Sequence, residues 1–353
     1  MHHCYADARS MWVFWDAFLE TVVRGASPAI PDLAASTQPP NLPPARDDLL
    51  GLPPWPSIQG WLKSHDLVMS AMKPDLVLLP PSSPLPTTGE PKDWPAGPGD
   101  FVRHSISESQ TAAVVAACKA RGITVAAAFY AALASATRVI QEADGSRLPK
   151  SLPPNYGCGL GVDYHVMIPF ALDMITPPIE VAERKVEEAP QERSLDELAQ
   201  DMNAFFQSTR RDFGPDPAGL DALTYYVRSM FVPATLAPSA PIFSSLGVAE
   251  HFIRRSFPGV DEAEEKEDRR HDGRSSKEEE GHHRRGPTSE LEVEDTYVMT
   301  LGAKLLNCVI LHTFKGKICA LSSFDESYFR AELLEGLLAG TFQKLLAWLE
   351  GEH

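Results

Sequence analysis

The chain has 353 residues, of which 43% are hydrophobic and 23% are charged, and its formal net charge is -16. These fractions are typical of a globular protein, and the negative charge argues against a nucleic-acid backbone as the main partner. No apolar stretch is long enough to cross a bilayer, and the start lacks the regions of a secretory signal. The five cysteines are scattered without a C-x-x-C pair, which indicates free thiols in a reducing, cytoplasmic compartment and no metal site.

The chain opens with MHHCYADARSMWVFWDAFL, in which His2 and His3 precede Asp7 and an amphipathic run. An imidazole near its ordinary pKa can take a proton from a hydroxyl or amine as that group attacks a carbonyl. The neighbouring histidine of the pair and the carboxylate can hold that ring in place. This chemistry needs no metal, so the segment is a candidate catalytic centre; a remnant of an affinity tag is the alternative.

A proline-rich segment follows, because residues 28–98 hold 17 of the 31 prolines. Proline lacks a backbone donor and is excluded from helix interiors, so this part is expected to be mostly loop and extended chain. Residues 59–79 are expected to interrupt this loop region with a short helical or strand-like segment.

Three helices are predicted between residues 107 and 212. Ser107 and Gln110 form a capping box before Ala112, Val115 and Cys118, which are expected to face the core, and Gly122 ends this helix. Thr124 caps a second helix whose core face carries Phe129, Leu133 and Ile140, and Ser194 with Glu197 opens a third that buries Leu195, Leu198, Met202 and Phe205.

The C-terminal part reads as a hairpin followed by a helix. Residues 306–324 contain two β-branched runs around Lys315 and Gly316, and a long amphipathic helix is predicted over 328–349. Residues 261–290 carry 11 acidic and 7 basic residues and no apolar face, so they are expected to form a disordered insert. The chain is therefore of the α+β class, without the alternation of a nucleotide-binding sheet.

Two further signals are set aside. Residues 157–161 (GCGLG) hint at a dinucleotide loop, but a packed glycine-rich turn before a strand over 162–168 is the better interpretation. Five further histidines are isolated and lack metal-ligand spacing with another Cys or His: His65, His104, His165, His251 and His312.

The opening segment resembles the HHxxxDG signature of the acyl-CoA-dependent acyltransferase superfamily, with Ala8 in place of the glycine. Chloramphenicol acetyltransferase, condensation domains of nonribosomal peptide synthetases and trichothecene acetyltransferases share this signature. The segments SISESQTAAVVAACKARGITVAAAFYAALASA, PIFSSLGVAE and FKGKICALSSFDESYFRAELLEGLLAGTFQKLLAWL also resemble parts of the superfamily's second lobe. The resemblance implies a chloramphenicol-acetyltransferase-like two-lobe sandwich, with a first lobe that is incomplete in this chain.

The same resemblance implies roles for individual residues. His3 would be the general base, Asp7 a structural carboxylate, His2 and Ala8 supports of the motif, and Ser244 or Ser245 a donor to the oxyanion. Acyl-CoA would be a co-substrate and a small-molecule alcohol the acceptor, with no bound cofactor, nucleic acid or membrane.

Two domains follow from this interpretation. Residues 1–99 would be a remnant of the N-terminal lobe, and 100–353 the C-terminal lobe with its insert. A condensation-like domain that joins carrier-bound substrates and a catalytically inactive relative remain the alternatives to an O-acyltransferase.

Overall fold

The computed structural model describes residues 8–24, 58–59, 62, 76–77, 79, 82–83, 95–143, 155–161, 181–186, 194–212, 242–258, 291–300 and 307–351. The insert at 261–290, the strand expected over 162–168 and most of the proline-rich segment lie outside these ranges. The division into domains at residue 99 therefore stays a prediction.

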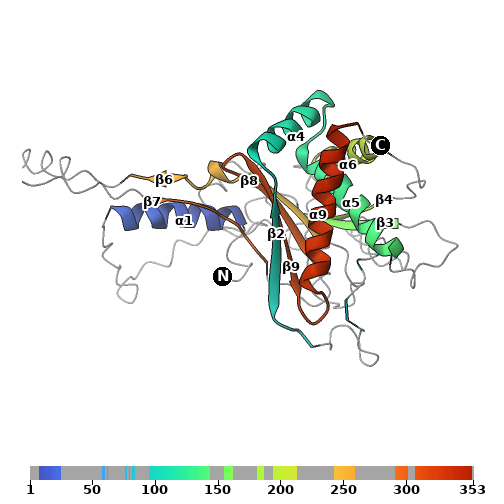
Figure 1. Cartoon of the computed structure of the whole chain (residues 1–353), viewed down its shortest axis with the longest axis horizontal. Helices are drawn as coiled ribbons and strands as arrows, with labels where there is room; N and C mark the ends of the chain where they lie inside the picture. Colours follow the sequence, from blue (N-terminus) through green and yellow to red (C-terminus); the bar gives the residue numbers. More distant parts are fainter. Residues whose placement is uncertain are drawn as a thin grey trace, which may run out of the picture.

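A mixed sheet of seven strands forms the centre of the described part (Figure 1). The order is β1-β3-β5-β8-β9-β2, and β4 pairs with β3. Strands β3, β5 and β8 run parallel, whereas β8, β9 and β2 are antiparallel neighbours. Their bounds are Leu76–Val77 (β1), Gly99–Ser105 (β2), Asn155–Gly161 (β3), Val181–Val186 (β4), Ile242–Val248 (β5), Cys308–Phe314 (β8) and Lys317–Asp325 (β9).

The predicted hairpin is confirmed by β8 and β9. Lys315 and Gly316 join the strands with φ angles of 48° and 71°, so both turn residues have the positive φ of a type I′ turn. Glycine adopts this conformation without strain, which is why the turn falls at this position. The glycines at 157–161 do not form the expected turn, because they lie within β3.

Helix α4 spans Glu108–Ala120 and begins with the predicted capping box. The Ser107 hydroxyl accepts from the backbone N–H of Gln110, and the Gln110 side chain accepts from the N–H of Ser107. Gly122 follows the helix with a φ of +67°. The expected core face was wrong in part: Thr111, Val114 and Cys118 are buried, whereas Ala112 and Val115 are exposed.

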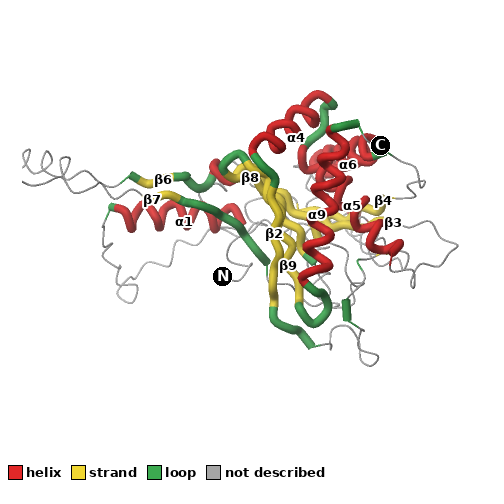
Figure 2. Tube along the Cα trace, viewed as in Figure 1, coloured by secondary structure: helices red, strands yellow, loops and turns green. Residues whose placement is uncertain are grey.

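Three further helices complete a layer on one face of the sheet (Figure 2). They are α5 (Val125–Ala143), α6 (Leu195–Asp212) and α9 (Ala331–Leu349). The Thr124 hydroxyl accepts from Ala127 N at the start of α5, and Ser194 and Glu197 form the predicted capping box of α6. Helix α9 begins three residues later than expected.

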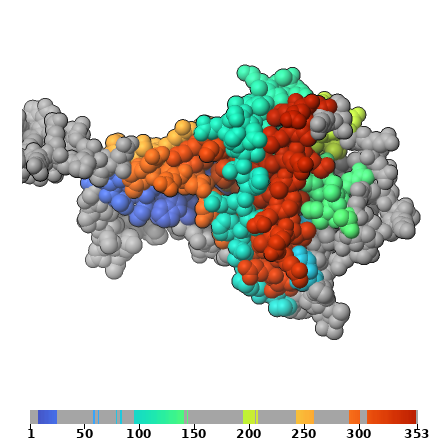
Figure 3. All heavy atoms as spheres, in the orientation of Figure 1, coloured from blue at the N-terminus to red at the C-terminus, as the bar shows by residue number. Residues whose placement is uncertain are grey.

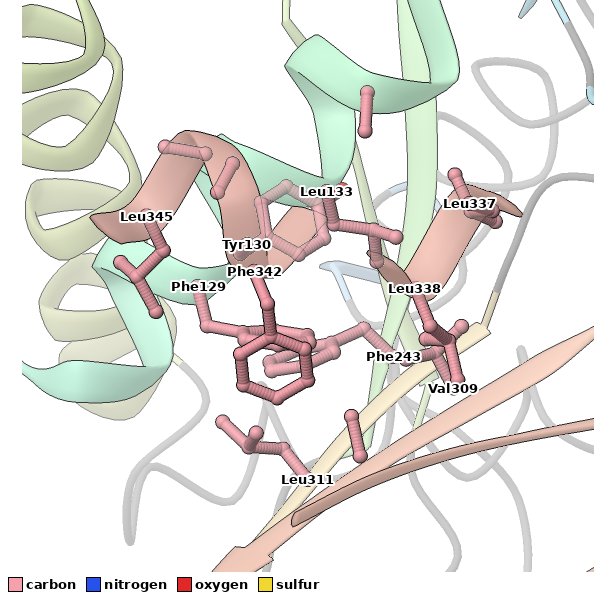
Figure 4. Packing of buried hydrophobic residues seen from close by; sticks show 14 of the residues in the cluster. Phe129, Tyr130, Leu133, Phe243, Val309, Leu311, Leu337, Leu338, Phe342 and Leu345 are labelled. Atoms are coloured by element: carbon pink, nitrogen blue, oxygen red, sulfur yellow. The ribbon is translucent and has the colours of Figure 1, made fainter. Parts of the chain in front are cut away.

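The main core lies between this layer and the sheet. Phe129 of α5 stacks on Phe243 of β5 at 5.8 Å between ring centroids, and its edge meets Phe342 of α9 at 5.4 Å (Figure 4). Leu133 and Met202 are buried as predicted, while Leu195, Leu198 and Ile140 are partly buried at its margin. The side chain of Phe205 lies outside the described part.

A second, smaller core occupies the other face of the sheet. It is built by α1 (Ala8–Val23), the short helix η3 (Ala249–His251) and side chains of β5 and β8. Helix α1 also contacts β6 (Ser256–Phe257), which pairs with β7 (Leu291–Glu292). Figure 3 shows α1 directly beside the segment that contains β7. The buried residues of this core are Trp12, Leu246, Ala249, Ile253, Ile310 and Phe314.

None of the described helices is by itself long and apolar enough to span a bilayer. Helix α4 and the start of α5 reach that length together, but they are bent by 104°.

Candidate active site

The predicted motif stands immediately before α1. His2, His3 and Asp7 lie outside the described residues, which resume at Ala8. Ala8, which replaces the glycine of the signature, is the first residue of α1 and packs at the edge of the small core. The amphipathic run after the motif is thus helical.

Arg9 links the start of α1 to β5. Its Nε donates a hydrogen bond to the carbonyl oxygen of Leu246 at 3.1 Å, across 237 positions of sequence. Its guanidinium carbon lies 5.1 Å from the centre of the Phe252 ring, and Gly247 beside Leu246 has a φ of +81°. Two segments that the sequence analysis assigned to one site, the end of the motif and the SSLG strand, therefore lie in contact.

Ser244 and Ser245 are half-buried on β5 and face opposite sides of the sheet. Ser244 is paired with Ile310 of the small core, and Ser245 with Leu311 of the main core. A bulge follows Ser245 and turns the end of the strand. Of the two predicted oxyanion donors, Ser244 is the one that shares a face with α1.

His312 is a residue of this face that the sequence analysis set aside. It lies on β8 with 3% of its surface exposed, and its Nε2 is 3.0 Å from the carbonyl oxygen of Thr296. Its ring meets the Trp12 ring edge-on at 5.7 Å between centroids. Burial lowers the pKa of His312 from its ordinary value of 6.5 and is the largest influence on it. The sequence feature that could have indicated His312 is its position as a single histidine inside an apolar, β-branched strand.

Charged side chains fasten α1 to the segment after η3. Arg254 binds both carboxylate oxygens of Asp16 and also Glu20, with N–O distances of 2.6 to 3.2 Å. Burial alone would raise the pKa of Asp16, but the hydrogen bonds from Arg254 outweigh it and the pKa is lowered. This ion-paired cluster holds the helix against β6 from the outside.

The described part offers no activated thiol or metal cluster. Burial raises the pKa of Cys118, Cys308 and Cys319 to about 11 each, so these thiols stay protonated at neutral pH. No group of three histidine, cysteine or acidic side chains is placed to hold a metal ion among the residues described.

One cavity of about 370 Å³ opens beside the β8–β9 turn, away from Ser244. Its lining combines two acidic and two basic side chains with glycine: Glu108, Glu292, Arg255, Lys315 and Gly316. It contains no predicted site residue, so we do not assign the reaction to it.

Comparison of this fold with solved structures identifies its class. The chain has the fold of chloramphenicol-acetyltransferase-like acyltransferases and condensation domains, which confirms the fold class predicted from the sequence. No family model matches the chain, and no curated protein matches its sequence.

Three solved structures illustrate the likeness. The trichothecene 15-O-acetyltransferase of Fusarium sporotrichioides matches with a TM-score of 0.59 and 13% identity, over 83% of this chain and 53% of its own. The epimerization domain of tyrocidine synthetase B matches with a TM-score of 0.55 and 11% identity, over 99% of this chain and 68% of its own. Polyketide synthase associated protein 5 of Mycobacterium tuberculosis matches with a TM-score of 0.54 and 14% identity, over 100% of this chain and 73% of its own. The chain thus spans about half the length of the acetyltransferase.

Proposed function

We propose that this chain transfers an acyl group from a CoA thioester to a hydroxyl of a small molecule, with His3 as the general base. The observation that carries the proposal is the hydrogen bond from Arg9 to Leu246, because it joins the helix after the motif to the strand with Ser244. The fold shared with an O-acetyltransferase supports the reaction class.

The reaction follows from the chemistry of the residues. His3 takes the proton of the acceptor hydroxyl as its oxygen attacks the thioester carbonyl. The tetrahedral oxyanion then accepts hydrogen bonds, for which the Ser244 hydroxyl is the candidate donor. When the intermediate collapses, the C–S bond breaks, and the CoA thiolate takes the proton from the His3 imidazolium.

The other motif residues have supporting roles in this proposal. Asp7 and His2 hold the base in position, Ala8 begins the helix, and no metal or bound cofactor takes part. The partners are acyl-CoA and an alcohol, in the cytoplasm.

A condensation-like reaction between carrier-bound substrates is the second candidate. It is favoured by the likeness to the epimerization domain of a peptide synthetase and to the cyclization-docking bidomain from Sorangium cellulosum. Here His3 would activate an amine or hydroxyl presented by a carrier protein instead of a free alcohol. The third candidate is an inactive relative, favoured by the alanine at position 8.

The test measures acetyl transfer from acetyl-CoA to each alcohol of a panel. The readout is the release of free CoA thiol. Loss of the base costs about 10²–10⁴ in rate, so His3→Ala should abolish turnover while His2→Ala retains most of it. His283→Ala is the matched control, because His282 and His283 form a second histidine pair without a following aspartate.

Three outcomes decide between the candidates. Full activity in His3→Ala excludes the proposed base. Turnover with carrier-bound thioesters but not with acetyl-CoA selects the condensation reaction. A folded wild-type chain that turns over neither donor is the inactive relative.

A further inference from the structure

Trp12 and His312 form a buried pair that joins α1 to β8. Trp12 is 1% exposed and His312 is 3% exposed, and their rings meet edge-on at 5.7 Å between centroids. Trp12 stands four residues after Ala8, which is about one helical turn from the start of α1. The buried ring therefore anchors the first turn of the helix to β8.

The polar atoms of the two rings are complementary. A carbonyl oxygen can only accept a hydrogen bond, so the contact with Thr296 places the imidazole proton on Nε2. Nδ1 is then an acceptor, and Trp12 Nε1–H is a donor. Both atoms are buried without a hydrogen-bond partner among the residues described. A hydrogen bond between these two atoms would satisfy a donor and an acceptor that are costly to bury unpaired.

The charged groups around His312 come from three other elements. They are Glu250 of η3, Asp295 of the segment after β7 and Arg103 of β2. Glu250 is engaged by Lys315 N and Arg255 through Oε1, and Asp295 by Arg103 at 2.6 Å. Cys319, opposite His312 on β9, keeps its proton because burial raises its pKa to about 11. The neighbouring charged groups are thus engaged elsewhere, and His312 Nδ1 has no hydrogen-bond partner among the residues described.

We infer that His312 is a positioning residue for the proposed acyl transfer: it fixes Trp12, and through it the first turn of α1, the helix that follows the histidine motif. The inference rests on the proposed function. Its Nε2 side anchors the ring to the segment after β7, and its Nδ1 side acts on the helix. His312 itself touches no reacting atom.

Two substitutions separate the two sides of the ring. In His312→Gln the side-chain amide can still donate to Thr296 O, but the acceptor at the Nδ1 position is lost. In His312→Asn the shorter side chain keeps an acceptor near the Nδ1 position and loses the reach to Thr296. Trp12→Phe keeps the aromatic packing and removes only the donor.

The experiment measures kcat, KM for acetyl-CoA and hydrogen exchange of the α1 amides in wild type and variants, with α9 as the internal reference. Misplacement of a catalytic group costs rate more than substrate affinity, so His312→Gln and Trp12→Phe should lower kcat about tenfold with KM unchanged. Exchange in α1 should accelerate while that in α9 does not. His312→Asn should retain most of the activity, and the Trp12→Phe/His312→Gln double variant should be no worse than either single variant.

Unchanged kcat and unchanged α1 exchange in His312→Gln and Trp12→Phe would overturn the inference, as would losses that multiply in the double variant. If the wild-type chain shows no acyl transfer, the proposed function fails. The positioning role is then decided by α1 exchange alone: faster exchange in both variants supports it, and wild-type exchange overturns it.

Discussion

Arg9 of α1 and Leu246 of β5 are joined by a hydrogen bond of 3.1 Å, although 237 positions separate them in the sequence. The bond reaches β5 at its bulge, where Gly247 has a φ of +81°. A Cβ on Gly247 would stand 3.8 Å from Arg9 Nη2, which is an ordinary contact. The conformation of the backbone, and not a lack of space, is what requires glycine at this position.

Gly247→Ala should therefore lower the free energy of unfolding by about 1–2 kcal/mol, because an L-residue is strained in this conformation. Gly336→Ala is the matched control: Gly336 lies within α9 with open space around its Cβ position, so alanine should stabilise the helix by about 0.5–1 kcal/mol. Urea unfolding of the two variants measures both effects. Equal effects of the same sign would show that the φ at 247 does not constrain the fold.

The two tryptophans of α1 allow a comparison within one helix. Trp12 is 1% exposed in the small core, whereas Trp15 is 44% exposed and touches only the exposed rings of Phe14 and Phe18 among the aromatic contacts described. Trp12→Ala should cost about 3–5 kcal/mol through the cavity it leaves. Trp15→Ala should cost about 1 kcal/mol or less. Thermal unfolding of the two variants checks the order, and a larger loss in Trp15→Ala would contradict the orientation of α1.

The stability of the protein should depend on pH through His312. Its pKa is lowered in the folded state by burial, so the unfolded chain binds more protons as pH falls below the ordinary value of 6.5. The contribution of the neutral imidazole is complete above that pH and is lost on acidification towards the folded-state pKa. The slope from this group is at most about 1.4 kcal/mol per pH unit.

His312→Phe should flatten this dependence between about pH 7 and pH 5, measured by urea unfolding at each pH. His251→Phe serves as the control, because His251 is exposed and its substitution leaves the small core unchanged. A wild-type slope in His312→Phe would mean that the buried imidazole is not linked to unfolding.

The sequence predicted local features better than long-range ones. The capping boxes at Ser107 and Ser194 and the turn at Lys315 and Gly316 depend on neighbouring residues, and each was confirmed. Helix α4 carries alanines on several sides, so its sequence pattern did not show which side meets the sheet. Val114 is buried where Val115 was expected.

Two boundaries were wrong because contacts from elsewhere in the chain override local preference. The glycines of β3 suggest a turn, but pairing with β4 and β5 holds them extended. Tyr328 and Phe329 continue the apolar pattern of α9, yet Ser82 N donates to the carbonyl oxygen of Tyr328 and the Tyr328 hydroxyl donates to the carbonyl oxygen of Pro95, so this segment stays outside the helix. The candidate site was predicted incompletely for the same reason. The sequence indicated the motif and the SSLG strand separately, but it did not indicate that Arg9 and His312 connect α1 to the sheet.

The pairing of β6 with β7 has a consequence for the architecture of the chain. Ser256 lies opposite Glu292 and Phe257 opposite Leu291, so the two ends of the segment between β6 and β7 lie side by side. Closing a longer or shorter loop between such points changes the free energy only slowly with length. The segment between β6 and β7 should therefore tolerate insertions, and a reporter or an epitope could be introduced there without disturbing either core.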